Sequence, residues 1–179
     1  MRIISGTMKG RKLNNFKGKD IRPTADKVKE AIFSMIAGYV NESIVFDLFS
    51  GTGNLGLEAL SRGAAKCYFC DNSYESVKLT RSNIEICRAE DRSKVISGSF
   101  EKALLTVQEK ADVIFLDPPY RKGLMESCFE KISELESLNE NGVIVAEHGT
   151  NEVLPDVIAG FNKIRERRYG TILVSLYGM

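Results

Sequence analysis

A stretch of apolar residues that ends in Asp-Pro-Pro-Tyr constrains the fold of this chain more than any other feature of its sequence. Residues 113–116 are β-branched, aromatic or aliphatic, which is typical of a strand buried within a parallel sheet. The strand must end there because two prolines, which cannot continue a hydrogen-bond ladder, soon follow. It would present Asp117, Pro118, Pro119 and Tyr120 at the carboxyl edge of the sheet, where open α/β sheets bind ligands. An acidic side chain, outward carbonyls and an aromatic ring suit the capture of a planar amine.

A glycine-rich loop lies upstream of this strand. An apolar strand is expected over residues 43–49, and a helix that follows the loop is expected to end near Gly63. Gly51, Gly53 and Gly56 would let a ligand approach the backbone closely, and the first turn of the helix offers free N–H groups. The order of strand, turn and helix is the context that such a loop needs to bind a nucleoside cofactor.

Two acidic residues indicate the class of that cofactor. Asp47 precedes Gly51 by four residues, where a carboxylate would repel the pyrophosphate of a dinucleotide but could bind a cationic amino group. S-adenosylmethionine has an ammonium group, a sulfonium and no phosphate, so the sequence favours it over NAD. Asp71 ends a second strand, expected over residues 66–70, and can accept both ribose hydroxyls. The alternative for Asp71 is that it caps the helix expected to begin at Ser73.

The rest of the predicted cofactor site surrounds these two carboxylates. Ser99 and Phe100 follow a third strand, expected over residues 94–97, and would flank the adenine, although Phe100 could equally belong to the core. Thr24 could belong to the site or serve as the N-cap of a helix leading into the sheet. The complete predicted set consists of Thr24, Asp47, Phe49, Gly51, Gly53, Asn54, Asp71, Asn72, Ser99 and Phe100.

The first 29 residues are strongly basic although the net charge of the chain is only +1. They carry nine Lys or Arg against two Asp, and the remainder is mildly acidic. Apolar residues are interleaved with the basic ones, which predicts a small β-hairpin over residues 2–16. We expect residues 1–22 to form a phosphate-binding arm and residues 23–179 to form a second domain; the alternative is a solvated tail. The proposed phosphate ligands are Arg2, Lys9, Arg11, Lys12 and Arg22.

The remaining patterns predict alternating helices and strands, and hence an α/β fold with a mostly parallel sheet. Further helices are expected over residues 24–37, 73–89, 101–109 and 122–137, and further strands over residues 143–147, 161–169 and 171–177. Asn141-Gly142 predicts a turn into the strand that follows it, and Gly170 predicts an antiparallel hairpin at the sheet edge.

Several other chemistries are disfavoured by the sequence. Cys67 and Cys70 have the spacing of half a zinc site, but no second pair accompanies them, so we expect buried structural thiols and no metal. His148, the only histidine, is expected to have a structural or peripheral role because no cysteine or serine nucleophile is placed near it. The apolar runs are only a few residues long, and we expect a cytoplasmic protein that does not contact a membrane.

Taken together, the motifs resemble the bacterial RsmD family over essentially the whole chain. The resemblance is carried by Met1-Arg-Ile-Ile-Ser-Gly, Gly10-Arg-Lys-Leu, Arg22-Pro-Thr, Asp47-Leu-Phe-Ser-Gly-Thr-Gly, Leu57-Glu-Ala-Leu-Ser-Arg-Gly-Ala and Phe115-Leu-Asp-Pro-Pro-Tyr. The Asp-Pro-Pro-Tyr motif is shared with DNA and protein amino-methylases, whereas the N-terminal segment and the Leu57 block are more specific. Ser50-Gly-Thr-Gly replaces the family's usual Ala-Gly-Ser-Gly, and Asp71 stands where glutamate is common.

The resemblance implies a Rossmann-like class I methyltransferase with a seven-stranded sheet. Its reaction would move a methyl group from S-adenosylmethionine to the exocyclic N2 of a guanine in 16S ribosomal RNA. Asp117 and the carbonyl of Pro118 would accept the two amino hydrogens, and Tyr120 would stack on the flipped base. Residues 1–22 would then bind RNA, and we expect a monomer that acts on 16S rRNA or on an assembling small subunit.

Three alternatives remain open at this point. The first is an amino-methyltransferase that acts on DNA or on protein glutamine; the absence of a target-recognition domain disfavours DNA, and the basic arm disfavours a free amino acid. The second is a non-catalytic protein that binds S-adenosylmethionine or RNA, which predicts a degraded motif at Asp117. The third and weakest is a dehydrogenase.

Overall fold

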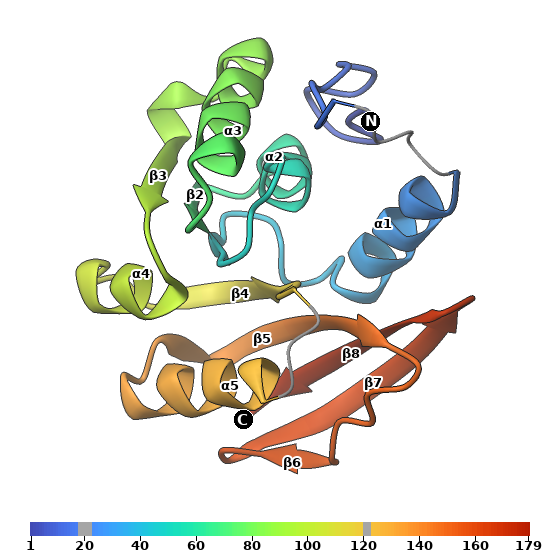
Figure 1. Ribbon diagram of the computed structural model, residues 1–179, viewed down its shortest axis with the longest axis vertical. Coiled ribbons are helices and arrows are strands. Elements are labelled where there is room, and N and C mark those ends of the chain that lie inside the picture. The colour runs from blue at the N-terminus through green and yellow to red at the C-terminus, as the bar shows by residue number, and fades with distance from the viewer. Residues whose placement is uncertain (18–22, 120–122) are drawn as a thin grey trace.

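The computed structural model describes residues 1–17, 23–119 and 123–179, which form one mixed sheet with helices on both faces (Figure 1). Its eight described strands lie in the order β3-β2-β1-β4-β5-β8-β7-β6. They are β1 (Ile44–Asp47), β2 (Lys66–Asp71), β3 (Ser93–Ser97), β4 (Ala111–Leu116), β5 (Leu138–Gly149), β6 (Val157–Ile158), β7 (Phe161–Tyr169) and β8 (Ile172–Gly178). The helices are α1 (Pro23–Met35), α2 (Asn54–Ser61), α3 (Tyr74–Cys87), α4 (Phe100–Thr106) and α5 (Leu124–Glu134), with a 3-10 turn at Glu90–Arg92.

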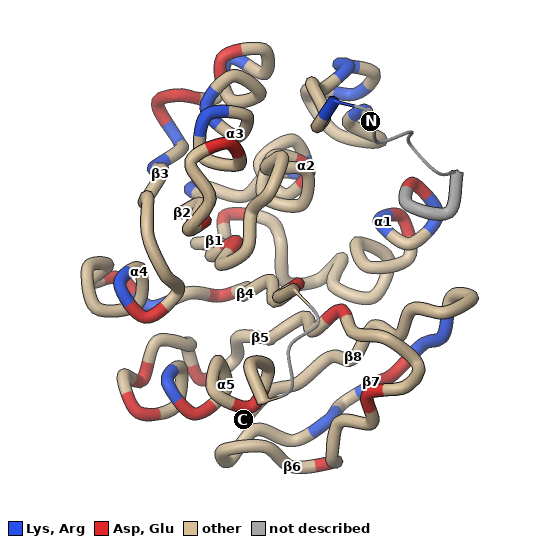
Figure 2. Tube along the Cα trace, in the orientation of Figure 1, with Lys and Arg blue, Asp and Glu red and all other residues tan. Residues whose placement is uncertain are grey.

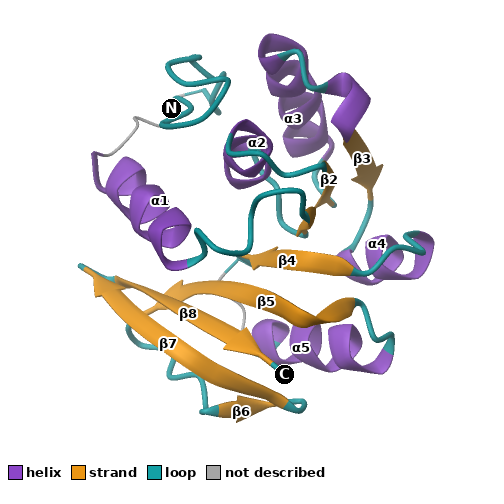
Figure 3. Cartoon of the chain, turned by 180° about the vertical axis from the view of Figure 1, so that it is seen from behind, coloured by secondary structure: helices purple, strands orange, loops and turns teal. Residues whose placement is uncertain are grey.

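Strands β1 to β5 run parallel, and β6, β7 and β8 complete the sheet with antiparallel pairing. The order reverses between β1 and β4, which lie side by side although β2 and β3 separate them in sequence. Figure 3 shows the β7–β8 hairpin extending the sheet beyond β5, with the short β6 at its outer edge. The predicted α/β fold and C-terminal hairpin are confirmed. The two residues of β6, which raise the number of strands above the expected seven, are too few to produce a sequence pattern.

Two hydrophobic layers explain why the central strands are apolar throughout. In β4, Val113 and Phe115 pack with α1, α2 and α3 on one face, while Ile114 and Leu116 pack with α4 and α5 on the other. Each of these four side chains is at most 1% exposed. Both faces of β4 are therefore covered, and only its carboxyl end is free to approach a ligand.

The turn expected at Asn141-Gly142 is wrong, because both residues lie inside β5. Ala111 of β4 pairs with Leu138, but Val113 pairs with Val143, so the register shifts between the two pairs. The extra residues of β5 lie in this irregular stretch, and the strand continues through a dipeptide that usually marks a hairpin.

The N-terminal segment is packed on the body of the protein. The expected hairpin is reduced to a single antiparallel bridge between Arg2 and Lys12. Ile3, Met8 and Leu13 are at most 6% exposed and belong to the same core as α1 and α2. Residues 1–17 therefore have a defined place in the fold, while RNA binding by this segment stays a prediction.

Helix α1 begins at Pro23, so Thr24 lies in its first turn, and the expected N-cap position for Thr24 is wrong. Proline is favoured at the first helical position because its missing N–H has no intrahelical partner there. No helix in the described ranges is long and apolar enough to cross a bilayer.

Candidate active site

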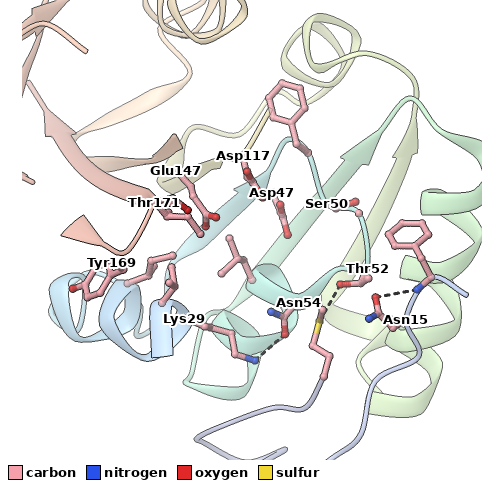
Figure 4. Close-up of a pocket in the computed structure, with 18 of the residues that line it drawn as sticks. Asn15, Lys29, Asp47, Ser50, Thr52, Asn54, Asp117, Glu147, Tyr169 and Thr171 are labelled. Atoms are coloured by element: carbon pink, nitrogen blue, oxygen red, sulfur yellow. Dashed lines mark hydrogen bonds between the residues drawn. The ribbon is translucent and has the colours of Figure 1, made fainter. Parts of the chain in front are cut away.

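A cavity of about 580 Å³ lies where the strand order reverses, at the carboxyl ends of β1, β4 and β5 (Figure 4). The glycine loop forms one wall, and α1 and the turn between β7 and β8 form others. Its lining includes Asp47, Asp117 and Glu147, each at or near the end of a strand. Open parallel sheets bind their ligands at this kind of position.

The backbone of the glycine loop has the conformation that its sequence predicts. Gly51 and Gly53 have φ angles of 53° and 77°, in the left-handed region that side chains disfavour. Gly56 has a different reason to be glycine, because a Cβ there would lie 2.3 Å from the Phe69 ring. The loop can therefore approach a ligand closely while α2 packs directly against β2.

Asp71 fixes this loop to the end of β2. Its Oδ2 accepts a hydrogen bond from the Gly51 N–H at 2.9 Å, and its Oδ1 accepts one from the Ser73 N–H at 2.9 Å. Ser73 itself is the N-cap of α3. Asp71 thus positions the glycine loop, and a contact with a ribose stays a prediction.

Asp47 is a buried carboxylate at the inner end of the cavity. It is 3% exposed, and its Oδ2 accepts a hydrogen bond from the Gly56 N–H at 3.1 Å. Burial raises the pKa of Asp47 to about 7; the hydrogen bond opposes the shift, and the nearby Asp117 and Asp71 carboxylates add to it. A cationic ligand in the cavity would favour the ionised form.

Asp117 and Glu147 stand side by side. Leu116, the last residue of β4, pairs with Ala146 of β5, and Asp117 and Glu147 directly follow these two residues in the chain. Asp117 as a residue is exposed and lines the cavity, but desolvation of its carboxyl group raises its pKa to about 6. Burial, and then the Asp117 charge, raise the pKa of Glu147 to about 8. Glu147 is absent from the predicted site, although it ends an apolar stretch just as Asp47, Asp71 and Asp117 do.

The structure brings only part of the predicted cofactor set to the cavity. Phe49, Gly51 and Asn54 line it together with Asp47. Ser99 is the N-cap of α4, and Phe100 is buried with its ring 5.9 Å from that of Phe49. Asn72, Ser99 and Phe100 are not among the lining residues, so their contact with an adenine remains a prediction.

The Asp-Pro-Pro-Tyr motif is described up to its third residue. Pro118 is buried and Pro119 is exposed beside Asp117. Tyr120 and Arg22 lie outside the described residues, and so does the side chain of Thr24.

The N-terminal segment contributes residues to the cavity that the sequence did not predict. Met1, Asn15 and Phe16 line it, together with Lys29 from α1. The Thr52 hydroxyl lies 3.3 Å from the Met1 sulfur. The segment expected to bind RNA therefore reaches the same cavity as the glycine loop.

The predicted phosphate ligands of this segment occupy different environments. Arg2, Lys9 and Lys12 are exposed, and Figure 2 shows basic residues gathered on this segment and again along β7. Arg11 is half-buried, and its guanidinium donates to the Ile86 carbonyl at 3.1 Å, near the end of α3. Arg11 thus holds the segment against α3.

Cys67, Cys70 and His148 are buried and are not among the residues that line the cavity. Cys67 and Cys70 are free thiols at most 1% exposed, and burial raises the pKa of each. His148 is 1% exposed, with Nε2 2.8 Å from the Ser175 hydroxyl and Nδ1 2.8 Å from the Glu152 carbonyl. Among the described residues no group of His, Cys, Asp and Glu is arranged to hold a metal ion.

Comparison with known proteins gives matches over nearly the whole chain. The family model described as conserved hypothetical protein 95 matches residues 1–178. YlbH of Bacillus subtilis is 38% identical, with 99% of this chain and 98% of that protein covered. The ribosomal RNA small subunit methyltransferase D of Haemophilus influenzae is 32% identical, with 99% and 93% covered. The solved structure of yhhF from Escherichia coli has a TM-score of 0.88 and 31% identity, with 99% and 96% covered.

Proposed function

The chain belongs to the RsmD family, whose model is described as conserved hypothetical protein 95, and from that premise we propose that it methylates N2 of a guanine in 16S ribosomal RNA with S-adenosylmethionine as donor. Relatives from Haemophilus influenzae and Escherichia coli that carry the name ribosomal RNA small subunit methyltransferase D support an enzyme acting on rRNA. One observation carries the proposal: Asp117 shares a cavity with Asp47 and the glycine loop.

The donor set of the cavity fits S-adenosylmethionine better than a phosphorylated cofactor. Three carboxyl groups, from Asp47, Asp117 and Glu147, line it, and those that are ionised would repel a pyrophosphate. The sulfonium and ammonium groups would instead be attracted. Asp47, Gly51 and Asn54 are the residues that would hold this cofactor, which supplies the electrophilic methyl group when bound.

Asp117 would prepare the acceptor amine for attack. The lone pair of a guanine amino group is delocalised into the ring, which makes the nitrogen a poor nucleophile. A carboxylate that accepts one N–H, and a carbonyl such as that of Pro118 that accepts the other, would turn the lone pair toward the methyl group. The same carboxylate stabilises positive charge as it develops on the nitrogen.

The raised pKa of Asp117 also suits it to accept the proton that the methylated amine must lose. Its pKa of about 6 leaves it mostly ionised at neutral pH, yet closer to neutrality than an ordinary aspartate. The methylated nitrogen must lose a proton, and a base with a pKa near the working pH accepts one efficiently. Positioning supplies much of the remaining rate, since orientation of two reactants is worth up to about 7 to 11 kcal/mol.

We further propose that the substrate is 16S rRNA or an assembling small subunit, and that the protein acts as a monomer in the cytoplasm. The exposed Lys9 and Lys12 would contact phosphates, while Met1 and Phe16 of the same segment border the cavity. The segment would thereby guide RNA toward the reacting centre.

The proposal is tested by Asp117→Asn, which keeps the size of the side chain but removes its charge. We expect kcat for methyl transfer to small-subunit RNA to fall by at least about a hundredfold, because a general base typically contributes 10² to 10⁴. Calorimetry should show S-adenosylmethionine binding within about threefold of wild type. The exposed Asp91→Asn serves as control and should change neither quantity. Undiminished turnover by Asp117→Asn would refute the assignment, and equal losses of turnover and binding would move Asp117 into the cofactor site.

A further inference from the structure

Glu147 is a carboxyl group in the cavity for which the reaction described so far has no use. It lines the cavity next to Asp117, and no hydrogen bond joins its side chain to another described residue. Figure 4 shows it beside Asp117 and Thr171, on the wall away from Thr52 and Asn54 of the glycine loop. Keeping a carboxyl group in such a position is costly when no described residue bonds to it, and a ligand that donates hydrogen bonds would offset the cost.

The identity of that ligand follows from the chemistry of the bases. Guanine is the base in which the ring nitrogen beside the amino group carries a hydrogen, so N1 and N2 both donate on one edge. In adenine and cytosine the nitrogen beside the amino group is an acceptor, which a carboxylate would repel. A pair of neighbouring carboxyl groups therefore complements guanine specifically.

We propose, as an extension of the function given above, that Glu147 accepts a hydrogen bond from N1–H of the target guanine and thereby selects guanine among the bases that carry an amino group. Asp117 would take the adjacent N2–H on the same edge of the base. The register of β4 and β5 supports these two roles for Asp117 and Glu147, because paired residues on neighbouring parallel strands lie about 4.8 Å apart.

The raised pKa of Glu147 is compatible with this role. Burial and the charge of Asp117 favour the protonated form when no ligand is present. A carboxyl group accepts N1–H through an oxygen in either form, and in the protonated form its O–H can also donate to O6 of guanine. Asp117, with the lower pKa, keeps the negative charge beside the reacting nitrogen.

A rival role for Glu147 is to bind the cationic part of the cofactor, which is also expected in this cavity. The two roles differ in what they affect: a cofactor ligand changes the affinity for S-adenosylmethionine, whereas a base ligand changes the preference between bases.

The test compares guanine with 2-aminopurine at the position that the wild-type enzyme methylates. 2-Aminopurine keeps the reacting amino group, but its N1 is an acceptor and it lacks O6. Small-subunit RNA carrying either base would be methylated by wild type, by Glu147→Leu and by a control, Glu140→Gln, which changes an exposed residue of the same strand. Thermal unfolding and binding of S-adenosylmethionine would confirm that each variant is folded.

We expect wild type and the control to prefer guanine by about 5- to 150-fold in kcat/KM, since such a contact is worth about 1 to 3 kcal/mol of discrimination. In Glu147→Leu the ratio should fall to within about threefold, mainly through slower reaction with guanine, with cofactor affinity unchanged. An unaltered ratio would overturn the inference, and if it came with weakened cofactor binding it would assign Glu147 to the cofactor. Failure of wild type to methylate the guanine RNA would instead overturn the proposed function itself.

Discussion

Lys29 and Glu58 form an ion pair 3.0 Å long, with their side chains 1% and 0% exposed. The Lys29 ammonium also donates to the Arg2 carbonyl at 2.6 Å. The Glu58 carboxylate accepts from the backbone N–H groups of Ile4 and Ser5 at 2.8 and 3.0 Å. This pair fastens the N-terminal segment to α1 and α2. Because Lys29 borders the cavity and donates to Asn54 at 2.8 Å, the pair also supports the wall of the candidate site.

Removal of one partner should destabilise the fold strongly. In Glu58→Leu the Lys29 charge would remain buried without its partner, which costs about 3 to 5 kcal/mol in comparable sites. Burial already lowers the pKa of Lys29, and Glu58 opposes that shift. Urea unfolding measures the loss. The matched control is Lys131→Ala, which breaks the more exposed pair between Lys131 and Glu134 and should cost no more than about 1 kcal/mol. Similar losses in both variants would contradict this account.

Asn83 of α3 should couple the N-terminal segment to the glycine loop. Its side chain donates to the Thr52 carbonyl at 2.8 Å and to the Asn14 carbonyl at 3.0 Å, and it accepts from the Asn14 N–H at 2.7 Å. Asn83→Ala would leave these groups without partners, and we expect a loss of about 1 to 3 kcal/mol in stability. Binding of S-adenosylmethionine should weaken by about tenfold, or 1.4 kcal/mol, as the loop loses support.

The neighbouring Ser82 provides a control for this coupling. It accepts a hydrogen bond from the Asn14 side chain at the surface, so Ser82→Ala removes an interaction with the same residue without exposing a buried group. Both variants would be compared by calorimetry. Equal cofactor affinity in Asn83→Ala and Ser82→Ala would show that the buried amide does not support the loop.

The strand-end carboxyl groups could be predicted from sequence because their signal is local. Asp47, Asp71 and Asp117 each follow an apolar stretch, and the stretch itself specifies a buried strand with a polar end. Glu147 also follows an apolar stretch, but no glycine-rich loop or proline motif follows it to indicate a binding site. Its place beside Asp117 depends on the pairing of β4 with β5, and a sequence does not specify which strands pair.

Contacts between residues far apart in the chain could not be predicted from the sequence. Arg11 is a predicted phosphate ligand and Lys29 is counted only in the charge of the basic segment, yet Lys29 is buried against Glu58 and Arg11 contacts the end of α3. Their partners lie 29 and 75 residues away in the chain. The type of a side chain indicates which groups it can bind, but the tertiary fold determines which of those groups lie next to it.

Cofactor binding should strengthen as the pH rises. Burial raises the pKa of Asp47 to about 7, so the carboxylate that attracts a cation is mostly protonated at pH 6 and mostly ionised at pH 8. The affinity for S-adenosylmethionine should rise by about tenfold over that interval, and Asp47→Asn should flatten the dependence. Calorimetry at pH 6, 7 and 8 checks this. An affinity independent of pH in the wild type would show that the Asp47 charge does not contribute.

The raised pKa values of Asp47 and Asp117 have the opposite effect on the stability of the protein without cofactor, which should fall as the pH rises. Folded Asp47 and Asp117 retain protons that the unfolded chain, with ordinary pKa values near 3.8, has already released. Their contribution to the free energy of unfolding therefore falls as the pH rises from about 4 through 6 and 7. Urea unfolding at several pH values, compared with the double variant Asp47→Asn/Asp117→Asn, isolates this contribution.

Charge reversal at the exposed lysines of the N-terminal segment should weaken RNA binding. Lys9→Glu and Lys12→Glu together should lower the affinity for small-subunit RNA and reduce the slope of its salt dependence, by about 0.7 to 0.9 for each phosphate that the protein no longer neutralises. The control is Lys110→Glu, which changes an exposed residue at the amino end of β4, opposite to the cavity. Filter binding at several salt concentrations would measure both. An unchanged slope would exclude the two lysines from the RNA interface.

Transfer of label from methyl-labelled S-adenosylmethionine would show which acceptor this protein methylates. The acceptors are small subunits from cells that lack this protein, their naked RNA, duplex DNA and a protein extract, and the labelled products are digested and identified by mass. We predict N2-methylguanosine in the subunits or their RNA, and no label in the duplex DNA or the protein extract. Label found only in DNA or protein would contradict the substrate, and no label in any acceptor would contradict the assignment of an enzyme.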